Sequence, residues 1–386
     1  MFRTLSLLLL AALPAAAETV TVTRLVIADH AAPRLLVTDA AGATLLQLSL
    51  AEPVRLHHGL HHGQVALREA QLGRVSLLET GLRLEGHGDH GDLRLAAPSL
   101  LPVELRGPRP SHVVGSDGRL AVFFDGDGSA SLIAAGQEAA PVRLSAAHAH
   151  HGVAYPFASL AGPRLAISEA PAAGERPSAV SLRGADGAEL ARREDCPRLH
   201  GEGRSGALIA FGCADGVLLL DARSGAFRKI ANPEGAGERM VRNLAGGEDW
   251  RLLLGDFGPE AMMVVDPEAN AMRVVPLPAR RLHFTLDPAR AETGFAITED
   301  GVLHAFSTLD GTPRGRIQAT GRYSLEGGAA VARPRLSAAG GLVAVTDPAA
   351  GRVALHDAET LALRQVIETG GRPFDIRLVS LTGESH

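Results

Sequence analysis

Short apolar runs separated by turn residues recur along most of this chain, and no other feature limits its possible folds as strongly. Segments 206–230, 249–275, 293–317 and 341–367 each contain three such runs, and a less regular apolar stretch precedes each segment. Asp-Gly, Ser-Gly and Gly-Gly pairs separate the runs, a pattern typical of strands joined by tight turns. The repeat is roughly 37 to 45 residues long, the length of a four-stranded blade of a β-propeller. The sequence therefore predicts an all-β propeller of about eight four-stranded blades, with seven blades as the alternative.

The two ends of the chain support a closed ring. Residues 24–50 contain three expected strands rather than four, at 24–28, 34–39 and 44–50. Residues 373–379 form one more expected strand, which has no partner in its own part of the chain. We therefore expect the C-terminal strand to join the first blade as its innermost strand and to close the ring. An open sandwich or two smaller β domains would not explain why the repeat continues to the end.

The first 17 residues have the features of a secretory signal peptide. A short start that contains Arg3 precedes an apolar run over 5–13, which is too short to span a bilayer, and 15–17 is a small-residue cleavage site. We expect a mature chain of residues 18–386 that forms a single propeller domain in the periplasm, without membrane insertion after cleavage. An uncleaved membrane anchor is the alternative. The net charge of −5, without a long basic run, argues against nucleic acid as a partner.

The two cysteines, Cys196 and Cys213, are consistent with export. In an oxidising compartment a pair of cysteines is more often a disulfide than two free thiols. A zinc–thiolate pair is the alternative, although the spacing of the two residues is not that of a CxxC motif. If they form a disulfide, it would stabilise the fold by roughly 3 kcal/mol in the chain-entropy model.

Histidines are the residues with the clearest chemical meaning in this sequence. The chain has 16 of them, and most of those before residue 201 fall in three tight groups. The groups are His57, His58, His61 and His62; His87, Asp89, His90 and Asp92; and His148, His150 and His151. Neutral imidazole is the commonest metal ligand in proteins, and carboxylates beside it suit zinc. The sequence therefore indicates a metal-binding protein, provided that the fold brings the groups together.

The order of strands within a blade predicts which histidines share one end of the channel. Connections between blades and loops that join the second and third strands lie at the same end of a propeller. We therefore expect His30, both histidine groups before residue 93, and all histidines from His112 to His283 at that end. His304, His356 and His386 are the remainder, and we interpret His304 and His356 as structural.

Three histidines are expected to enter neighbouring blades at the channel mouth, and they are the best candidates for a metal site. These are His112, His151 and His200, with Asp125 beside them in the loop of the third blade and His150 next in sequence. Zinc accepts three histidines and a carboxylate in a tetrahedron, so we predict a zinc site there. The loops at 57–62 and 86–92 contain glycines and are expected to be mobile, which suits capture and release of an ion better than a closed site.

Several longer motifs make the sequence similar to a known family. They are 28–33 (ADHAAP), 85–92 (EGHGDHGD), 121–126 (AVFFDG), 150–153 (HHGV), 196–202 (CPRLHGE), 210–216 (AFGCADG) and 281–288 (RLHFTLDP). The chain resembles the AztD family of periplasmic zinc metallochaperones over most of its mature length, and the run at 85–92 is the most specific match. The resemblance implies a propeller that binds Zn²⁺ and hands it to the solute-binding protein of a zinc ABC importer. It also implies that Cys196 and Cys213 form a disulfide.

Two other classes of function are alternatives. A metal-dependent propeller enzyme, such as a lyase or hydrolase, would need an acid or base near the metal, and Glu202 or Glu169 are the candidates. The sequence contains no GxSxG, HExxH or CxxCH motif, so we expect a protein that is not an enzyme. A protein-binding propeller with incidental histidines is the other alternative. We further expect a monomer.

Overall fold

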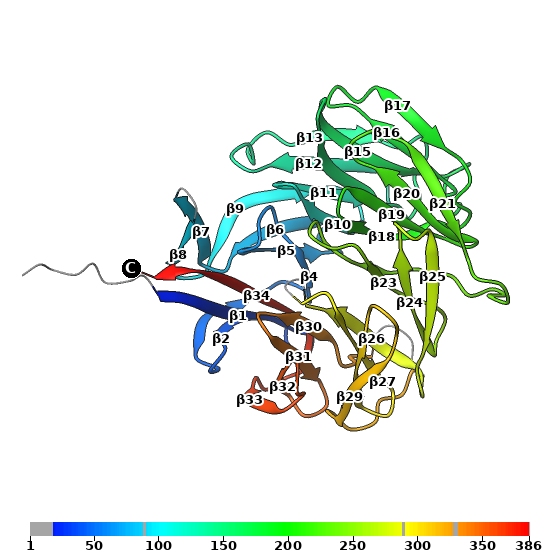
Figure 1. The fold of residues 1–386 in the computed structure, drawn as a ribbon. Coiled ribbons are helices and arrows are strands. Elements are labelled where there is room, and N and C mark those ends of the chain that lie inside the picture. The colour runs from blue at the N-terminus through cyan, green and yellow to red at the C-terminus, as the bar shows by residue number, and fades with distance from the viewer. Residues whose placement is uncertain (1–17, 88–89, 288–289, 327–330, 386) are drawn as a thin grey trace, which may run out of the picture.

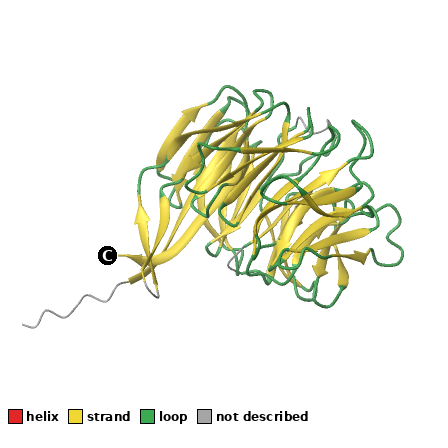
Figure 2. Cartoon of the chain, turned by 90° about the horizontal axis from the view of Figure 1, so that it is seen from above, coloured by secondary structure: helices red, strands yellow, loops and turns green. Residues whose placement is uncertain are grey.

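The computed structural model describes residues 18–385 except 88–89, 288–289 and 327–330, and these residues form strands and loops without a helix. Eight four-stranded antiparallel blades lie in a ring, as predicted, and a hairpin extends the sheet of the first blade to six strands (Figure 1). Figure 2 shows the loops gathered at the ends of the strands. Within the described residues, no helix is long and apolar enough to cross a membrane.

The blades follow one another along the chain, and the strands of each are named in order from the channel outward. Blade 1 consists of β34 (Pro373–Ser385), β1 (Glu18–Asp29), β2 (Arg34–Asp39) and β3 (Thr44–Ser49). Blade 2 consists of β4 (Arg55–His58), β5 (Gln64–Glu69), β6 (Arg74–Glu79) and β9 (Ser99–Arg106). Blade 3 consists of β10 (Pro110–Ser116), β11 (Arg119–Phe124), β12 (Ser129–Ala134) and β13 (Val142–Ser145). Blade 4 consists of β14 (Ala154–Ser159), β15 (Gly162–Glu169), β16 (Ala179–Arg183) and β17 (Glu189–Arg193).

The second half of the ring has the same organisation. Blade 5 consists of β18 (His200–Ser205), β19 (Leu208–Cys213), β20 (Gly216–Asp221) and β21 (Phe227–Ala231). Blade 6 consists of β22 (Leu244–Ala245), β23 (Leu253–Asp256), β24 (Ala261–Asp266) and β25 (Ala271–Pro276). Blade 7 consists of β26 (Arg281–Leu286), β27 (Thr293–Thr298), β28 (Val302–Ser307) and β29 (Pro313–Gln318). Blade 8 consists of β30 (Leu336–Ala339), β31 (Leu342–Asp347), β32 (Arg352–Asp357) and β33 (Leu363–Glu368).

The C-terminal strand closes the ring as the sequence predicts. β34 pairs antiparallel with β1 from Glu18 to Asp29, so the innermost strand of blade 1 comes from the other end of the chain. In Figure 1 the red end of the chain lies beside the blue start. Both strands are longer than the sequence pattern indicates, because they continue together beyond the blade.

Blades are held together by apolar side chains on both of their faces. On β11, Leu120, Val122 and Phe124 pack with Val75 and Leu77 of blade 2. The alternate residues of the same strand, Ala121 and Phe123, pack with blade 4. Side chains alternate between the two faces of a strand, and both faces are covered by a neighbouring blade. This double burial explains why the middle strands appear in the sequence as unbroken apolar runs.

One hairpin lies outside the regular blade pattern. β7 (Leu82–His87) and β8 (His90–Leu95) pair with each other in the connection between β6 and β9. β8 also contacts the end of β34 in parallel, through Glu384 and Asp92. The hairpin therefore extends the sheet of blade 1, although it belongs in sequence to blade 2.

Candidate metal centre

The inner strands of the blades all run in the same direction, so the channel has two distinct mouths. We call the end where the inner strands begin the inter-blade mouth, since the connections between blades lie there. The other end, which carries the connection that contains β7 and β8, is called the opposite mouth. Loops between the second and third strands of each blade lie at the inter-blade mouth as well.

Three imidazoles meet at the inter-blade mouth, as predicted. His112 lies on β10, His151 lies just before β14, and His200 begins β18, so three successive blades each contribute one ring. The ring centroids are separated by 5.1 Å (His112–His151), 5.5 Å (His112–His200) and 5.3 Å (His151–His200). One ligand nitrogen of each ring lies within 4.8 Å of the other two. In a tetrahedral zinc site the nitrogens are about 3.3 Å apart, so a small inward movement of the rings would complete it.

Hydrogen bonds determine which nitrogen of each ring is left for a metal. His112 Nδ1 is 2.9 Å from Glu202 Oε2, and His151 Nδ1 is 2.7 Å from Asp125 Oδ2. His200 Nδ1 donates to the carbonyl oxygen of Arg242 at 2.9 Å. All three rings therefore use Nδ1 for a protein acceptor and keep Nε2 available for a metal. Metal-binding histidines characteristically donate their other ring N–H to a carboxylate or a carbonyl, so the donor set fits a metal such as zinc.

The charges of the supporting carboxylates match this arrangement. Burial by itself would raise the pKa of Glu202, but the interaction with His112 outweighs it and the pKa is lowered. Burial would also raise the pKa of Asp125, but the hydrogen bonds from His151, Ser111 and the backbone of Gly152, together with the charge of His151, outweigh it and the pKa is lowered. Both groups are therefore carboxylates at neutral pH. Two negative charges behind a histidine group favour a cation in front of it.

A bulge at the start of β18 places His200 and Glu202. The register with β19 shifts between these two residues, and Gly201 between them has a φ of 73°. A Cβ atom on Gly201 would lie 1.8 Å from the carbonyl oxygen of Arg242, the acceptor that orients His200. Glycine is therefore needed here both for its left-handed backbone and for the close approach of that carbonyl.

His150 supports the site and is not part of the donor group. It is buried, its Nδ1 donates to the carbonyl of His148 (2.7 Å), and its Nε2 lies 2.9 Å from Ser168 Oγ. Ser168 Oγ in turn accepts the backbone N–H of Val153. Both ring nitrogens of His150 are thus used for the connection that presents His151. The prediction that His150 binds metal directly is not supported by this geometry.

Asp125 lies behind one of the three rings. The sequence predicts its carboxylate as the fourth zinc ligand, whereas in the structure it holds His151 Nδ1 from behind. Glu202, which the sequence suggests only as a candidate acid or base, holds His112 in the same manner. The only sequence signal for Glu202 is its position two residues after a histidine at the start of an expected inner strand. Its contact with His112 spans 90 positions and could not be read from local pattern.

The prediction for residues 57–62 is wrong about their place in the blade. His57 and His58 belong to the innermost strand β4, and His61 and His62 lie in the loop that follows, at the opposite mouth. His61 Nε2 is 3.1 Å from Glu79 Oε1, and His58 Nε2 accepts a hydrogen bond from Arg377. The sequence pattern misses this strand because its short sequence, RLHH, is too polar to show the apolar run that marks the other strands.

The same error displaces the group at 87–92. Because the sequence pattern shows no strand at β4, it places each of the following strands one position too early in the blade. His87 and His90 end β7 and begin β8, which lie in the connection from the third to the fourth strand, at the opposite mouth. Asp89 lies outside the described residues. Asp92 is buried on β8 and forms an ion pair with Arg94 at 3.0 Å.

Four further histidines lie outside the group of three. His30 is at the inter-blade mouth, where its ring contacts Phe374 and its Nε2 is 3.1 Å from the carbonyl of Val54. His283, on β26, accepts the backbone N–H of Leu336 through Nδ1. His304 contacts Thr298, and the buried His356 donates to the carbonyl of Leu361, in agreement with structural roles.

Replacing Glu202 with glutamine tests the supporting role. An amide keeps the shape of the side chain but removes the charge that orients and polarises His112, so we expect zinc affinity to fall about 10- to 100-fold. Chelator competition would measure this change, with Glu260→Gln, on the exposed turn before β24, as the control. Unchanged affinity in Glu202→Gln would show that the carboxylate has no part in the site.

Fold and site together define a class: an eight-bladed β-propeller with a group of three histidines, suited to hold a metal ion, at one mouth of its channel. No protein family model matches the sequence. The zinc chaperone AztD of Citrobacter koseri is 33% identical over 98% of this chain and 92% of its own length. The crystal structure of Citrobacter koseri AztD has a TM-score of 0.89 and 32% identity, and covers 95% of this chain and 100% of that one. The structure of apo AztD from the same organism has a TM-score of 0.85 and 30% identity, over 94% and 99% of the two chains. The chain therefore belongs to the AztD family.

Proposed function

We propose that this protein binds Zn²⁺ at His112, His151 and His200 and delivers it to the solute-binding protein of a zinc ABC importer. The observation that carries the proposal is the convergence of three imidazole rings, each with an acceptor at Nδ1 that leaves Nε2 for the metal. Membership in the family of a zinc chaperone supports zinc as the cargo. The role is binding and transfer rather than catalysis.

The number of ligands suits transfer. Among the residues that the structure describes, His112, His151 and His200 form the group of His, Cys, Asp and Glu side chains that can share one ion. Zinc usually has four ligands, so three histidines leave one position for water or for an incoming ligand. A ligand of the acceptor protein can occupy that position before the histidines release the ion, which avoids free zinc as an intermediate.

The site is also open to a partner. His151 is exposed, and it lines a groove of about 860 Å³ together with Asp125 and Arg68. We infer that the acceptor protein docks over the inter-blade mouth, since the ion leaves from there. In this proposal the chain acts in the periplasm as a monomer with one propeller domain, 18–386, after removal of residues 1–17. A cross-link to the acceptor that maps only to the opposite mouth would contradict this docking.

A metal-dependent enzyme is less well supported by the geometry. Glu169 is buried, and its carboxylate accepts hydrogen bonds from Ser181, Arg183 and the backbone of Ala147. Glu202 is held by His112 Nδ1, on the far side of the ring from the metal. Neither carboxylate is placed to move a proton at a substrate on the zinc.

Zinc binding by the histidines of the opposite mouth is a separate prediction. We expect them to capture zinc independently, and a His61→Ala/His62→Ala variant should then lose weak zinc binding but keep the tight site. Equilibrium dialysis at high zinc concentration would count the ions, with one ion fewer in the variant. Equal counts in the variant and the parent would contradict this role.

Transfer to an acceptor tests the proposed function directly. Zinc-loaded protein is mixed with the zinc-free solute-binding protein of a zinc importer, and zinc on each protein is followed over time. We expect the transfer rate to increase with acceptor concentration, because the acceptor takes part in the step that releases zinc. A rate that equals spontaneous dissociation at every acceptor concentration would contradict delivery by direct contact.

Zinc affinity should fall as the pH is lowered. Zinc and a proton compete for Nε2 of each histidine. Burial by itself would lower the pKa of His112, but Glu202 outweighs it, so the pKa is raised above the ordinary 6.5. Burial lowers the pKa of His200. The proton therefore displaces zinc first at His112, and we expect the Kd for zinc to rise steadily from about pH 8 to about pH 5. Chelator competition measures this, and a flat profile would contradict histidine ligation.

A further inference from the structure

A cluster of arginines lies at the inter-blade mouth, next to the three histidines in the ring of blades. Arg55 begins β4, Arg335 precedes β30, Arg377 lies on β34, and Arg68 lies near the end of β5. We call these four residues the arginine cluster. They come from blades 8, 1 and 2, whereas the histidine group comes from blades 3, 4 and 5.

One carboxylate lies among these four cations. Asp375 is buried and is 3.8 Å from Arg55 Nη1 and 3.9 Å from Arg335 Nε. These distances are too long for hydrogen bonds. Its oxygens instead accept the backbone N–H groups of Leu56 (3.0 Å) and Ile376 (3.2 Å). Asp375 therefore offsets part of the positive charge but leaves guanidinium donors unused.

Two donor atoms of the arginine cluster have no hydrogen-bond acceptor. Arg55 Nη1 and Arg68 Nε are buried from solvent and make no hydrogen bond with any residue that the structure describes. His57 Nε2, on the same inner strand as Arg55, is also buried and makes no hydrogen bond with any described residue. Buried polar groups are almost always paired, and an unpaired charged donor is especially costly. Three such atoms in one region indicate a missing acceptor.

The surroundings keep the region positively charged. The guanidinium groups of Arg55 and Arg335 both lie over the ring of Phe374, at 4.3 Å and 5.0 Å from its centroid. Burial, together with the neighbouring Arg335, lowers the pKa of Arg55 to about 10, which leaves it charged at neutral pH. The pKa of His283 is well below 6.5 because of burial and the nearby Arg335, so this ring adds no charge.

The chemistry of the cluster selects the kind of ligand. Guanidinium groups bind carboxylates and phosphates through paired N–H donors, and such hydrogen bonds are strong when they are shielded from water. Arg55 and Arg335 keep 27% and 28% of their side-chain surface exposed, so a small solute can reach them. Arg68 lines the groove that also contains His151, so this member of the cluster borders an open part of the surface.

We propose that the arginine cluster binds a small free oxyanion at the inter-blade mouth, beside the metal centre. The anion would lie against the exposed parts of Arg55 and Arg335, with Phe374 beneath the guanidinium groups. A small rotation of the Arg55 and Arg68 side chains would turn their buried, unused N–H groups toward it. The site goes beyond zinc delivery and does not depend on it, since none of its residues belongs to the histidine group.

Isothermal titration of the zinc-free protein with inorganic phosphate tests this proposal at constant ionic strength. We expect saturable binding of one phosphate per chain, weakened about tenfold or more in Arg55→Gln and in Arg335→Gln. Arg223→Gln, on the exposed turn after β20, is the matched control and should bind as the parent does. His112→Ala should also bind phosphate as the parent does, because phosphate binding does not depend on the proposed zinc site.

Other outcomes would overturn the proposal. If phosphate stabilised the parent protein no more than chloride does in a thermal melt, a measurement that needs no variant, the oxyanion site would be wrong. It would also be wrong if both arginine variants, shown by circular dichroism to be folded, bound phosphate as the parent does. Equal loss in Arg223→Gln would mean that net charge alone attracts the anion.

Discussion

Replacing His112 with alanine is expected to lower zinc affinity by at least about 100-fold, more than the loss of a supporting carboxylate. The substitution removes one of three ligand nitrogens and leaves Glu202 without the ring that it holds. Two histidines from separate blades cannot complete a zinc site by themselves, because loops and strands of a packed propeller do not rearrange cheaply. Chelator competition at pH 7.5 gives the Kd of parent and variant.

His304→Ala is the matched control for this experiment. His304 lies on β28 of blade 7 and contacts Thr298, outside the group of three, so its removal should leave zinc affinity unchanged. Anomalous scattering at the zinc edge would locate the ion independently of the variants. Tight zinc binding by His112→Ala, or an ion located away from these three rings, would disprove the proposed centre.

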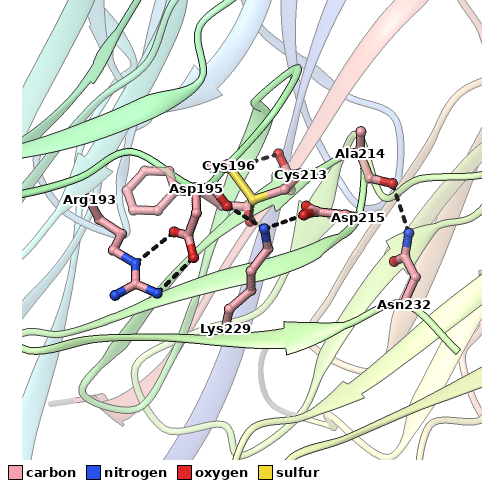
Figure 3. The surroundings of a disulfide bond; sticks show 10 residues. Arg193, Asp195, Cys196, Cys213, Ala214, Asp215, Lys229 and Asn232 are labelled. Atoms are coloured by element: carbon pink, nitrogen blue, oxygen red, sulfur yellow. Dashed lines mark hydrogen bonds and ion pairs between the residues drawn. A yellow bond between two sulfur atoms is a disulfide. The ribbon is translucent and has the colours of Figure 1, made fainter.

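The variant Cys196→Ala/Cys213→Ala is expected to lose about 2–5 kcal/mol of folding stability. The two cysteines form a disulfide in the structure, in agreement with the predicted pairing, and both are fully buried (Figure 3). The bond joins Cys196, in the connection before β18, to Cys213 at the end of β19. Cys196 lies four residues before His200. Surface interactions around it, such as that of Lys229 with Asp215, are solvent-exposed and contribute little.

Denaturant unfolding with and without a reducing agent measures this loss. Reduction should lower the midpoint of the parent toward that of the variant, while the variant itself should not respond to the reducing agent. Zinc affinity can be compared in the same two proteins, with and without the reducing agent. A lower affinity without the disulfide would show that the bond keeps His200 in place. A variant as stable as the oxidised parent would mean that the disulfide does not constrain the unfolded chain.

Much of the fold could be predicted because strands buried on both faces leave a strong local signal. The runs around Ala121 and Val343 are apolar throughout and are bounded by turn residues, so their repetition identifies the blades. The inner strand β4 leaves no such signal, because a channel-facing strand is covered on only part of its surface. That one omission places two histidine groups at the wrong mouth.

The histidine group could be located from sequence because each member enters an inner strand of a successive blade. Its supporting contacts could not be predicted, because they join residues far apart in the chain, such as His112 with Glu202. The predicted role of Asp125 differs from the observed one for a related reason: a carboxylate next to an imidazole can bind the metal or the ring, and only the direction of the side chain distinguishes the two.

Sequence alone determined the propeller, its closure by the C-terminal strand and the three histidines that enter blades 3, 4 and 5. These features follow from the order of strands and turns along the chain. Tertiary structure decided which nitrogen of each ring has a protein acceptor, which carboxylates stand behind the rings, and that four arginines gather around Asp375. Such contacts depend on how blades are placed around a common axis, and no local pattern of residues encodes that placement.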